Sequence, residues 1–124
     1  MNLASTFVVL HPDQSATPVE FTPTMFEELG RRFDGFKGRL LVSCYSFDSD
    51  WQMWERHPAG DEIVCLLSGR ARLMLEGSDA PVELRDAGAF TIVPKGAWHT
   101  AKTSVPTQML FVTPGAGTEH KPVG

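Results

Sequence analysis

Glycine and proline interrupt this chain of 124 residues at short intervals, with 11 glycines and 9 prolines spread along its whole length. Between them lie short runs rich in β-branched and aromatic residues, each bounded by Gly, Pro, Asp or Ser. The runs that we interpret as strands are 39–47, 51–57, 62–67, 70–76, 82–85, 89–93, 98–102 and 107–113. Short, evenly spaced strands with turns between them predict an all-β sandwich or barrel.

The N-terminal region adds one strand and one helix to this prediction. The apolar run Phe7–Leu10 has neither a positively charged segment before it nor a clear cleavage site after it, so it indicates an opening strand rather than a signal peptide. After Thr22-Pro23, apolar residues recur at helical spacing and predict a short helix that ends near Gly35 and packs over one end of the β-structure. Those apolar residues are Met25, Phe26, Leu29 and Phe33.

Length and charge restrict the classes of function. The chain has the size of one domain, within which we distinguish an N-terminal strand and helix (1–38), a barrel (39–113) and a Gly/Pro-rich tail (114–124). Eleven basic against 15 acidic residues give a net charge of −4, which argues against nucleic acid or an anionic membrane as partner. Without an export signal, we expect a cytoplasmic protein in which Cys44 and Cys65 are buried thiols rather than a disulfide.

Two segments carry residues suited to metal chemistry. In Glu55-Arg56-His57-Pro58-Ala59-Gly60-Asp61-Glu62, the alternation of strand side chains places Glu55 and His57 on one face, and a turn brings Glu62 back toward them. In the segment from Gly88 to His99, a histidine follows directly after a turn. Two neutral imidazoles with a carboxylate form a ligand set for Fe, Mn, Ni or Zn.

These two segments resemble the two conserved motifs of the cupin superfamily. Gly88, Pro94, Gly96 and His99 fit the motif G-x5-P-x-G-x2-H at every specified position. The latter half of the other motif, H-x4-E-x6-G, is fitted by His57, Glu62 and Gly69. The resemblance covers residues 39–113 and implies an all-β, RmlC-like jelly-roll barrel with a metal ion held at its mouth by the motif histidines and glutamate.

The chain departs from the family pattern at three positions. Ser49 stands where the family has a glycine, Thr103 where it has an asparagine, and Glu55 where it has the first ligand histidine. The form Glu-x-His-Pro-x-Gly-Asp-Glu and the tail around His120 are similar to those of a subgroup of small single-domain cupins. The resemblance therefore predicts Glu55, His57, Glu62 and His99 as metal ligands, with Glu55 also the candidate catalytic residue.

The role of Glu55 stays open at this point. It is a metal ligand, or a general base acting on a metal-bound water, or a buried carboxylate paired with a basic residue. His120 is either solvated or folded back over a pocket, and we favour solvation. The alternative for the histidines and Glu62 is a purely structural role at strand ends and in a turn.

Several apolar side chains are candidates to line a small-molecule pocket beside the histidines, although each is also a candidate for ordinary core. They are Tyr45, Trp51, Met53, Trp98, Met109 and Phe111, of which Trp98 points away from His99.

The sequence therefore predicts a cupin-type barrel that binds a divalent metal and a small molecule. Two classes of function remain: a metal-dependent dioxygenase, isomerase or lyase, or a non-catalytic binding or sensing protein. Because small barrels expose strand edges, we also expect a homodimer, in which the run Phe7–Leu10 could add to a partner's sheet.

Overall fold

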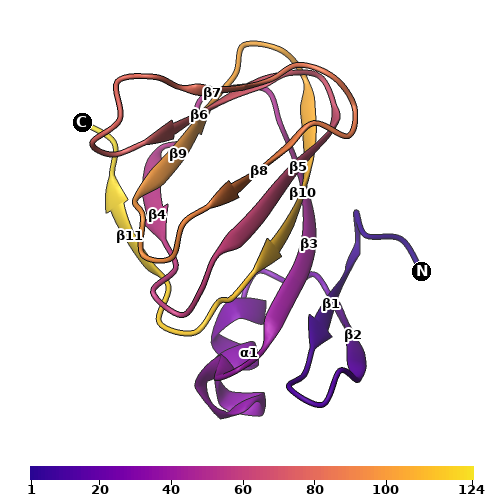
Figure 1. Cartoon of the computed structure of the whole chain (residues 1–124). Coiled ribbons are helices and arrows are strands. Elements are labelled where there is room, and N and C mark those ends of the chain that lie inside the picture. Colours follow the sequence, from indigo (N-terminus) through magenta and orange to yellow (C-terminus); the bar gives the residue numbers. More distant parts are fainter.

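Two antiparallel β-sheets form most of the molecule, and the computed structural model describes all of residues 1–124 (Figure 1). The first sheet has six strands in the spatial order β2-β1-β3-β10-β5-β8. Its strands are β1 (Thr6–Leu10), β2 (Ala16–Glu20), β3 (Leu40–Phe47), β5 (Glu62–Ser68), β8 (Phe90–Val93) and β10 (Thr107–Thr113).

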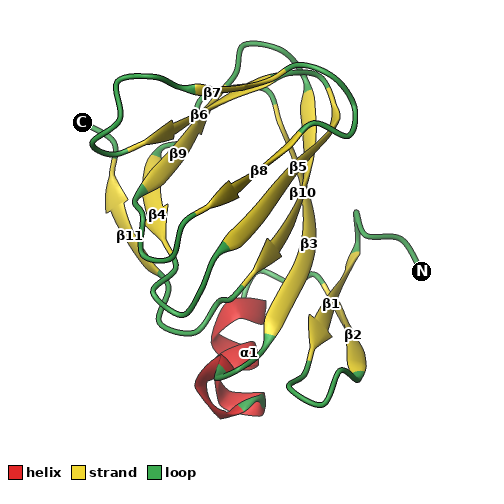
Figure 2. Cartoon of the chain, viewed as in Figure 1, coloured by secondary structure: helices red, strands yellow, loops and turns green.

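The second sheet has five strands in the order β11-β4-β9-β6-β7. Its strands are β4 (Met53–Arg56), β6 (Ala71–Leu75), β7 (Val82–Leu84), β9 (His99–Lys102) and β11 (Glu119–Pro122). The all-β architecture with one short α-helix is thus confirmed, and each of the eight sequence runs interpreted as strands forms a strand (Figure 2).

The Gly/Pro-rich tail of residues 114–124 contains a strand that was not predicted from the sequence. Its last part forms β11, which pairs with β4 in register, His120 opposite Glu55 and Lys121 opposite Trp54. This pairing places the end of the chain at the edge of the second sheet, where β11 lies next to β4 in Figure 1. The tail therefore belongs to the barrel and takes part in building the site.

The predicted helix is present but begins later than expected. Helix α1 (Met25–Arg32) starts after Thr24, whose hydroxyl donates to the Glu28 carboxylate instead of capping the helix. A single 3₁₀ turn, η1 (Asp34–Phe36), follows it and contains Gly35 at a positive φ of 64°. Neither helix is long and apolar enough to cross a membrane.

Helix α1 closes one end of the barrel, as predicted, and it does so with a narrow apolar face. Met25 and Leu29 are buried against Phe7 and Phe36, whereas Phe26 stays largely exposed. A second cluster lies between the sheets and includes Val64 and Leu73, which are completely buried. Burying each such side chain stabilises the fold by about 1.5–3 kcal/mol. One cluster therefore stabilises the packing of the two sheets, and the other stabilises the packing of α1 against them.

Strand β1 pairs with β2 on one side and β3 on the other, so the run Phe7–Leu10 has no free edge to offer a partner's sheet. That part of the expectation is wrong, because β2 was not anticipated. Cys44 and Cys65 are both free thiols, as predicted.

Candidate metal centre

Four side chains predicted as ligands converge at one end of the barrel. Glu55 lies on β4, His57 follows directly after that strand, Glu62 opens β5 and His99 opens β9. Pairing of β4 with β9 sets Glu55 directly opposite His99. Each residue offers one ligand atom, and these atoms all lie within 4.8 Å of one another. The structure thus brings together the four side chains that the resemblance to the cupin motifs places at one site.

Three of the four side chains in the cluster are almost completely buried. His57, Glu62 and His99 are 4%, 1% and 0% exposed, and only Glu55 reaches toward the opening. Nε2 of His57 lies 2.8 Å from Glu55 Oε1 and 3.2 Å from Glu62 Oε2. Nε2 of His99 lies 3.0 Å from Glu62 Oε1 and 3.8 Å from Glu55 Oε1. Both imidazoles thus aim the same nitrogen at the two carboxylates.

The contact between His99 and Glu62 brings together two buried atoms that both lack a hydrogen-bond partner. His99 Nδ1 lies 3.1 Å from the Ala97 carbonyl oxygen, which can only accept, so Nδ1 carries the proton. In the neutral ring, Nε2 then bears a lone pair that faces the lone pairs of Glu62 Oε1. Both atoms are buried and neither has a hydrogen-bond partner. Two unpaired acceptors at this distance fit a cation between them, and a divalent ion satisfies both at once.

His57 is oriented for ligation in the same way by a residue of the tail. The Thr118 hydroxyl donates to the Gly115 carbonyl at 2.8 Å, which leaves its oxygen to accept from His57 Nδ1, also at 2.8 Å. His57 therefore carries a proton on Nδ1, and Nε2 of its neutral form faces the carboxylates. Outer contacts of this kind hold the tautomer and the ring angle of metal-binding histidines.

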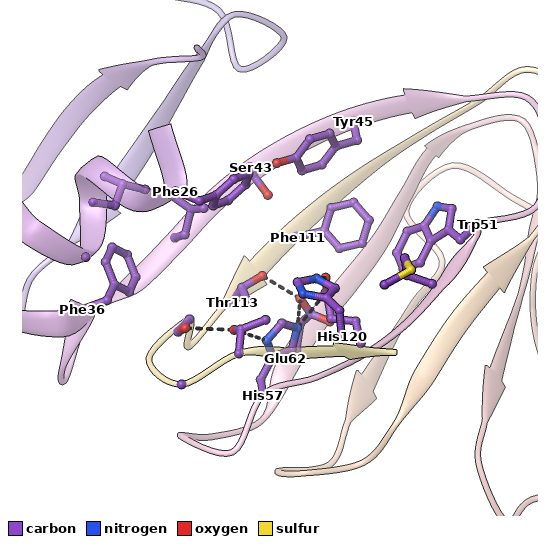
Figure 3. Close-up of a pocket in the computed structure, with 18 of the residues that line it drawn as sticks. Phe26, Phe36, Ser43, Tyr45, Trp51, His57, Glu62, Phe111, Thr113 and His120 are labelled. Atoms are coloured by element: carbon purple, nitrogen blue, oxygen red, sulfur yellow. Dashed lines mark hydrogen bonds and ion pairs between the residues drawn. The ribbon is translucent and has the colours of Figure 1, made fainter. Parts of the chain in front are cut away.

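The carboxylates have partners of their own. The Thr113 hydroxyl donates to Glu62 Oε2 at 2.6 Å, and the imidazole of His120 bonds Glu55 Oε2 at 2.9 Å (Figure 3). Burial acts to raise the pKa of Glu62, but the close contacts with the two buried histidines outweigh it and lower that pKa. Of the two alternatives for His120, the structure shows the one we did not favour: β11 folds this residue back over Glu55, although half of its side chain remains exposed to solvent.

The two groups nearest the opening are strongly coupled in the metal-free protein. Burial alone would lower the pKa of His57, but its hydrogen bonds to Glu55 and Glu62 raise it to about 9. For Glu55, burial is outweighed by hydrogen bonds from His120 and His57, which lower its pKa to about 2. Without a metal, a proton on His57 therefore holds the two negative charges together.

Two contacts at the site, those of Thr113 and Thr118, were not found from the sequence, and the position of His120 over the pocket was only the less favoured alternative. Thr113 shares the inward face of β10 with Phe111 and Met109, and this alternation is the one signal that could have marked it. Thr118 and His120 belong to a stretch without periodicity. Their positions depend on the pairing of β11 with β4, which no local sequence pattern predicts.

A cavity of about 760 Å³ opens beside the cluster and extends toward α1. Of the predicted pocket residues, Tyr45, Trp51, Met53 and Phe111 line it, whereas Met109 and Trp98 do not. Trp98 instead lies against the side chains of Arg56 and Lys121, in agreement with its predicted packing role.

Aromatic rings in contact with one another form one wall of this cavity (Figure 3). Phe111 has its ring centre 5.9 Å from that of Tyr45 and 5.8 Å from that of Trp51, and Phe47 continues the chain 5.7 Å from Trp51. No lysine or arginine lines the cavity, so its only full negative charges, Glu55 and Glu62, have no permanent cation beside them.

Solved structures of other proteins share the arrangement of the strands. A cupin-2 domain containing protein from Shewanella frigidimarina superposes with a TM-score of 0.53 at 19% sequence identity, over 60% of this chain and 70% of that chain. The chain has the cupin fold. Its buried His/Glu cluster is the kind of site at which cupins hold a metal ion.

Two enzymes also share the fold. The DMSP lyase DddQ from Ruegeria pomeroyi matches with a TM-score of 0.55 and 23% identity, over 68% of this chain but only 45% of the lyase. Hydroquinone 1,2-dioxygenase from Sphingomonas sp. TTNP3, solved with 4-hydroxybenzoate bound, matches with a TM-score of 0.53 and 18% identity, over 62% of this chain and 60% of its own. At such identities the likeness concerns the fold alone. No family model matches the sequence, and a comparison with curated proteins gives no significant match.

Proposed function

We propose that this cupin is an enzyme dependent on a divalent metal, with Glu55, His57, Glu62 and His99 as the ligands and a small molecule bound in the adjoining cavity. The observation that carries the proposal is the buried pair of His99 Nε2 and Glu62 Oε1, 3.0 Å apart and both without a hydrogen-bond partner. Leaving such groups unpaired in the interior costs about 1–3 kcal/mol each, and a metal ion removes this cost.

The donor set suits Fe, Mn, Ni or Zn, because two imidazole nitrogens and two carboxylate oxygens are borderline and hard ligands without a thiolate. An ion bound there supplies Lewis-acid polarisation of an oxygen on the bound molecule. The lyase and the dioxygenase that share the fold perform different chemistry, so the fold does not choose between a dioxygenase, an isomerase and a lyase.

The residues of the chain contribute proton transfer and exclusion of water. Glu55 is the site carboxylate nearest the opening, and its Oε2 bonds His120, whose side chain is 49% exposed. Glu55 and His120 thus form a hydrogen-bonded path from the interior of the site to solvent, along which a proton can leave. The aromatic wall and α1 cover the other sides of the cavity.

The cavity favours a neutral, mostly apolar substrate. A volume of about 760 Å³ accommodates a molecule with one or two rings, and the chain of aromatic side chains offers faces and edges for it. Two carboxylates balance the charge of a divalent ion when the histidines are neutral. With no lysine or arginine at the wall, the loaded site has no surplus positive charge for an anionic substrate.

Metal content tests the first part of the proposal. Protein purified without chelator or metal-affinity resin is analysed by plasma mass spectrometry, then emptied and titrated separately with Fe(II), Mn(II), Ni(II) and Zn(II). We expect one ion per chain, and we expect His57→Ala and His99→Ala each to lose most of it. His11→Ala is the matched control, because His11 bonds Thr17 and Arg39 away from the site. A double His57→Ala/His99→Ala variant with full occupancy would refute the site, and a wild-type protein that binds no ion would favour a non-catalytic binding protein.

The preference for a neutral ligand has a separate test. 2-Naphthol and 2-naphthoate have similar shapes but differ in charge at pH 7, and their binding to the metal-loaded protein is measured by calorimetry. We expect naphthol to bind at least tenfold more tightly, and Trp51→Ala to weaken it, with Trp98→Ala as the control outside the cavity. Equal or tighter binding of naphthoate would contradict the charge argument while leaving the metal site intact.

A further inference from the structure

Two hydroxyl groups that face the cavity have no hydrogen-bond partner within the chain. They belong to Ser43 and Tyr45 on β3, and we refer to them as the hydroxyl pair. Every second residue of β3 from Leu41 to Phe47 lines the cavity, as expected of a strand with one face turned inward. Ser43 is only 2% exposed, so its hydroxyl is enclosed by the protein and not open to bulk solvent.

Beyond the metal cluster, the other polar side chains that line the cavity are already bonded or are exposed. The hydroxyls of Thr113 and Thr118 bond members of the cluster, and His120 bonds one of its carboxylates. Ser46 and Gln52 are exposed to solvent. The hydroxyl pair is therefore the set of enclosed donors that a ligand can still use.

The two hydroxyls serve the same part of the cavity. Ser43 and Tyr45 are two residues apart on one strand, and Figure 3 shows the Tyr45 hydroxyl pointing toward Ser43. Burial, with a smaller contribution from the charge of Glu55, raises the pKa of Tyr45 to about 12, so the phenol keeps its proton and can donate. A serine hydroxyl also donates, and a carbonyl oxygen has two lone pairs with which to accept.

The hydroxyl pair lies across the sheet from the metal ligand Glu62. Ser43 is opposite Phe111 on β10, which in turn is opposite Val64 on β5. Glu62 comes two residues before Val64. Two strand spacings of about 4.8 Å and a step of about 6.6 Å along the strand separate the backbones of Ser43 and Glu62 by about 12 Å. Side chains fill part of this distance, which leaves room for a molecule of one or two rings.

We propose that the substrate carries an acceptor oxygen, such as a ketone carbonyl, at the end remote from the metal, and that Ser43 and Tyr45 bind this oxygen. This role rests on the proposed function, which places the other end of the molecule at the metal centre. It narrows the substrate to a neutral aromatic compound with an oxygen at each end. A compound with a hydrocarbon group in place of the carbonyl leaves both hydroxyls unpaired in the cavity, and the site discriminates against it.

Two ligands of the same shape test the hydroxyl pair. 6-Acetyl-2-naphthol has a carbonyl oxygen where 6-isopropenyl-2-naphthol has a methylene group, and calorimetry measures the binding of each to the metal-loaded protein. We expect the wild type to bind the acetyl compound at least about tenfold more tightly. Tyr45→Phe and Ser43→Ala should each reduce this preference to about threefold or less, while the affinity for the isopropenyl compound stays within about threefold of the wild type. Ser68→Ala is the matched control, since Ser68 lies on β5 outside the cavity and its loss should leave the preference unchanged.

Metal content and circular dichroism, measured on every sample, distinguish failure at the hydroxyl pair from failure of the metal site. Equal binding of the two ligands by the metal-loaded wild type would overturn the proposal and leave the metal site intact. So would a preference that survives in a folded Ser43→Ala/Tyr45→Phe variant. If Ser43→Ala fails to fold, Tyr45→Phe alone decides, because it keeps the ring that packs on Phe7 and Phe111. A wild type that takes up no metal would refute the proposed function, and the role of the hydroxyl pair with it.

Discussion

Replacing Thr118 with valine removes one hydroxyl from the tail and tests how the site is held together. In the wild type this hydroxyl accepts from His57 Nδ1 at 2.8 Å and donates to the Gly115 carbonyl at 2.8 Å. Valine keeps the shape of the side chain but offers no acceptor. His57 is only 4% exposed, so its Nδ1–H would then be buried without a partner.

The neutral ring can avoid that penalty by moving its proton to Nε2, where Glu55 Oε1 lies 2.8 Å away. This tautomer points a hydrogen at the metal position and cannot ligate. Removal of such an outer partner typically weakens metal binding by about 10- to 100-fold, which corresponds to about 1.4–2.7 kcal/mol. We expect a loss in this range for Thr118→Val.

The assay is competition with a chromophoric chelator at one fixed pH, using the metal found in the purified protein. Thr118→Ser is the control, because it retains the hydroxyl and should bind the metal within about threefold of the wild type. Thermal unfolding of the metal-free variants checks that the fold is intact. A Thr118→Val protein with wild-type affinity would show that the hydrogen bond from His57 Nδ1 to Thr118 does not set the tautomer of His57.

Three further predictions concern charge at the site. In the metal-free protein the pKa of His57 is raised from 6.5 to about 9. The stability supplied by its proton is therefore complete below pH 6.5 and is lost as the pH rises through 9. The melting temperature of the metal-free protein should fall across this pH range, and that of His57→Gln should change less. The metal must displace the same proton, so its apparent affinity should rise about tenfold per pH unit between pH 7 and 9, and an affinity independent of pH would contradict this. Glu55→Gln removes a charged oxygen donor and should weaken metal binding at least about tenfold, which titration can measure; unchanged metal binding with turnover reduced about a hundredfold would make Glu55 a general base instead.

The sequence predicted the strands well where turns punctuate them and poorly where they contain proline. The two strands that were missed, β2 and β11, include Pro18 and Pro122. Proline lacks a backbone donor and weakens any strand assignment, but an edge strand can tolerate it because one side of the strand needs no partner. Both β2 and β11 are edge strands. Their existence depends on a neighbouring strand that is distant in sequence, which a local pattern cannot reveal.

The ligand cluster was predictable for a related reason. Glu55 and His57 share a face through strand alternation, and the turn before Glu62 brings that residue back, so local geometry is sufficient for three of the four positions. His99 was assigned to the cluster because it is the histidine of the motif G-x5-P-x-G-x2-H. The partners that orient these side chains are Thr113 at the end of β10 and Thr118 just before β11, and only tertiary pairing brings them to within hydrogen-bond distance of the cluster.

The presence of Glu55, where the family pattern has a histidine, affects whether the loaded site prefers a neutral or an anionic small molecule. With Glu55 and Glu62 both ionised, a divalent ion leaves the site neutral, whereas Glu55→His would leave it with one positive charge. At about 5 Å and an effective dielectric constant of about 20, one unit charge changes the energy of an anionic ligand by about 3 kcal/mol. Glu55 is partly exposed, which reduces this value.

We therefore expect metal-loaded Glu55→His to shift the ratio of 2-naphthoate to 2-naphthol affinity by at least tenfold toward naphthoate, measured by calorimetry. Glu76→His is the control, since Glu76 pairs with Lys121 outside the cavity and should leave the ratio unchanged. An unchanged ratio in a Glu55→His protein that retains its metal would mean that charge balance at the site does not select the ligand.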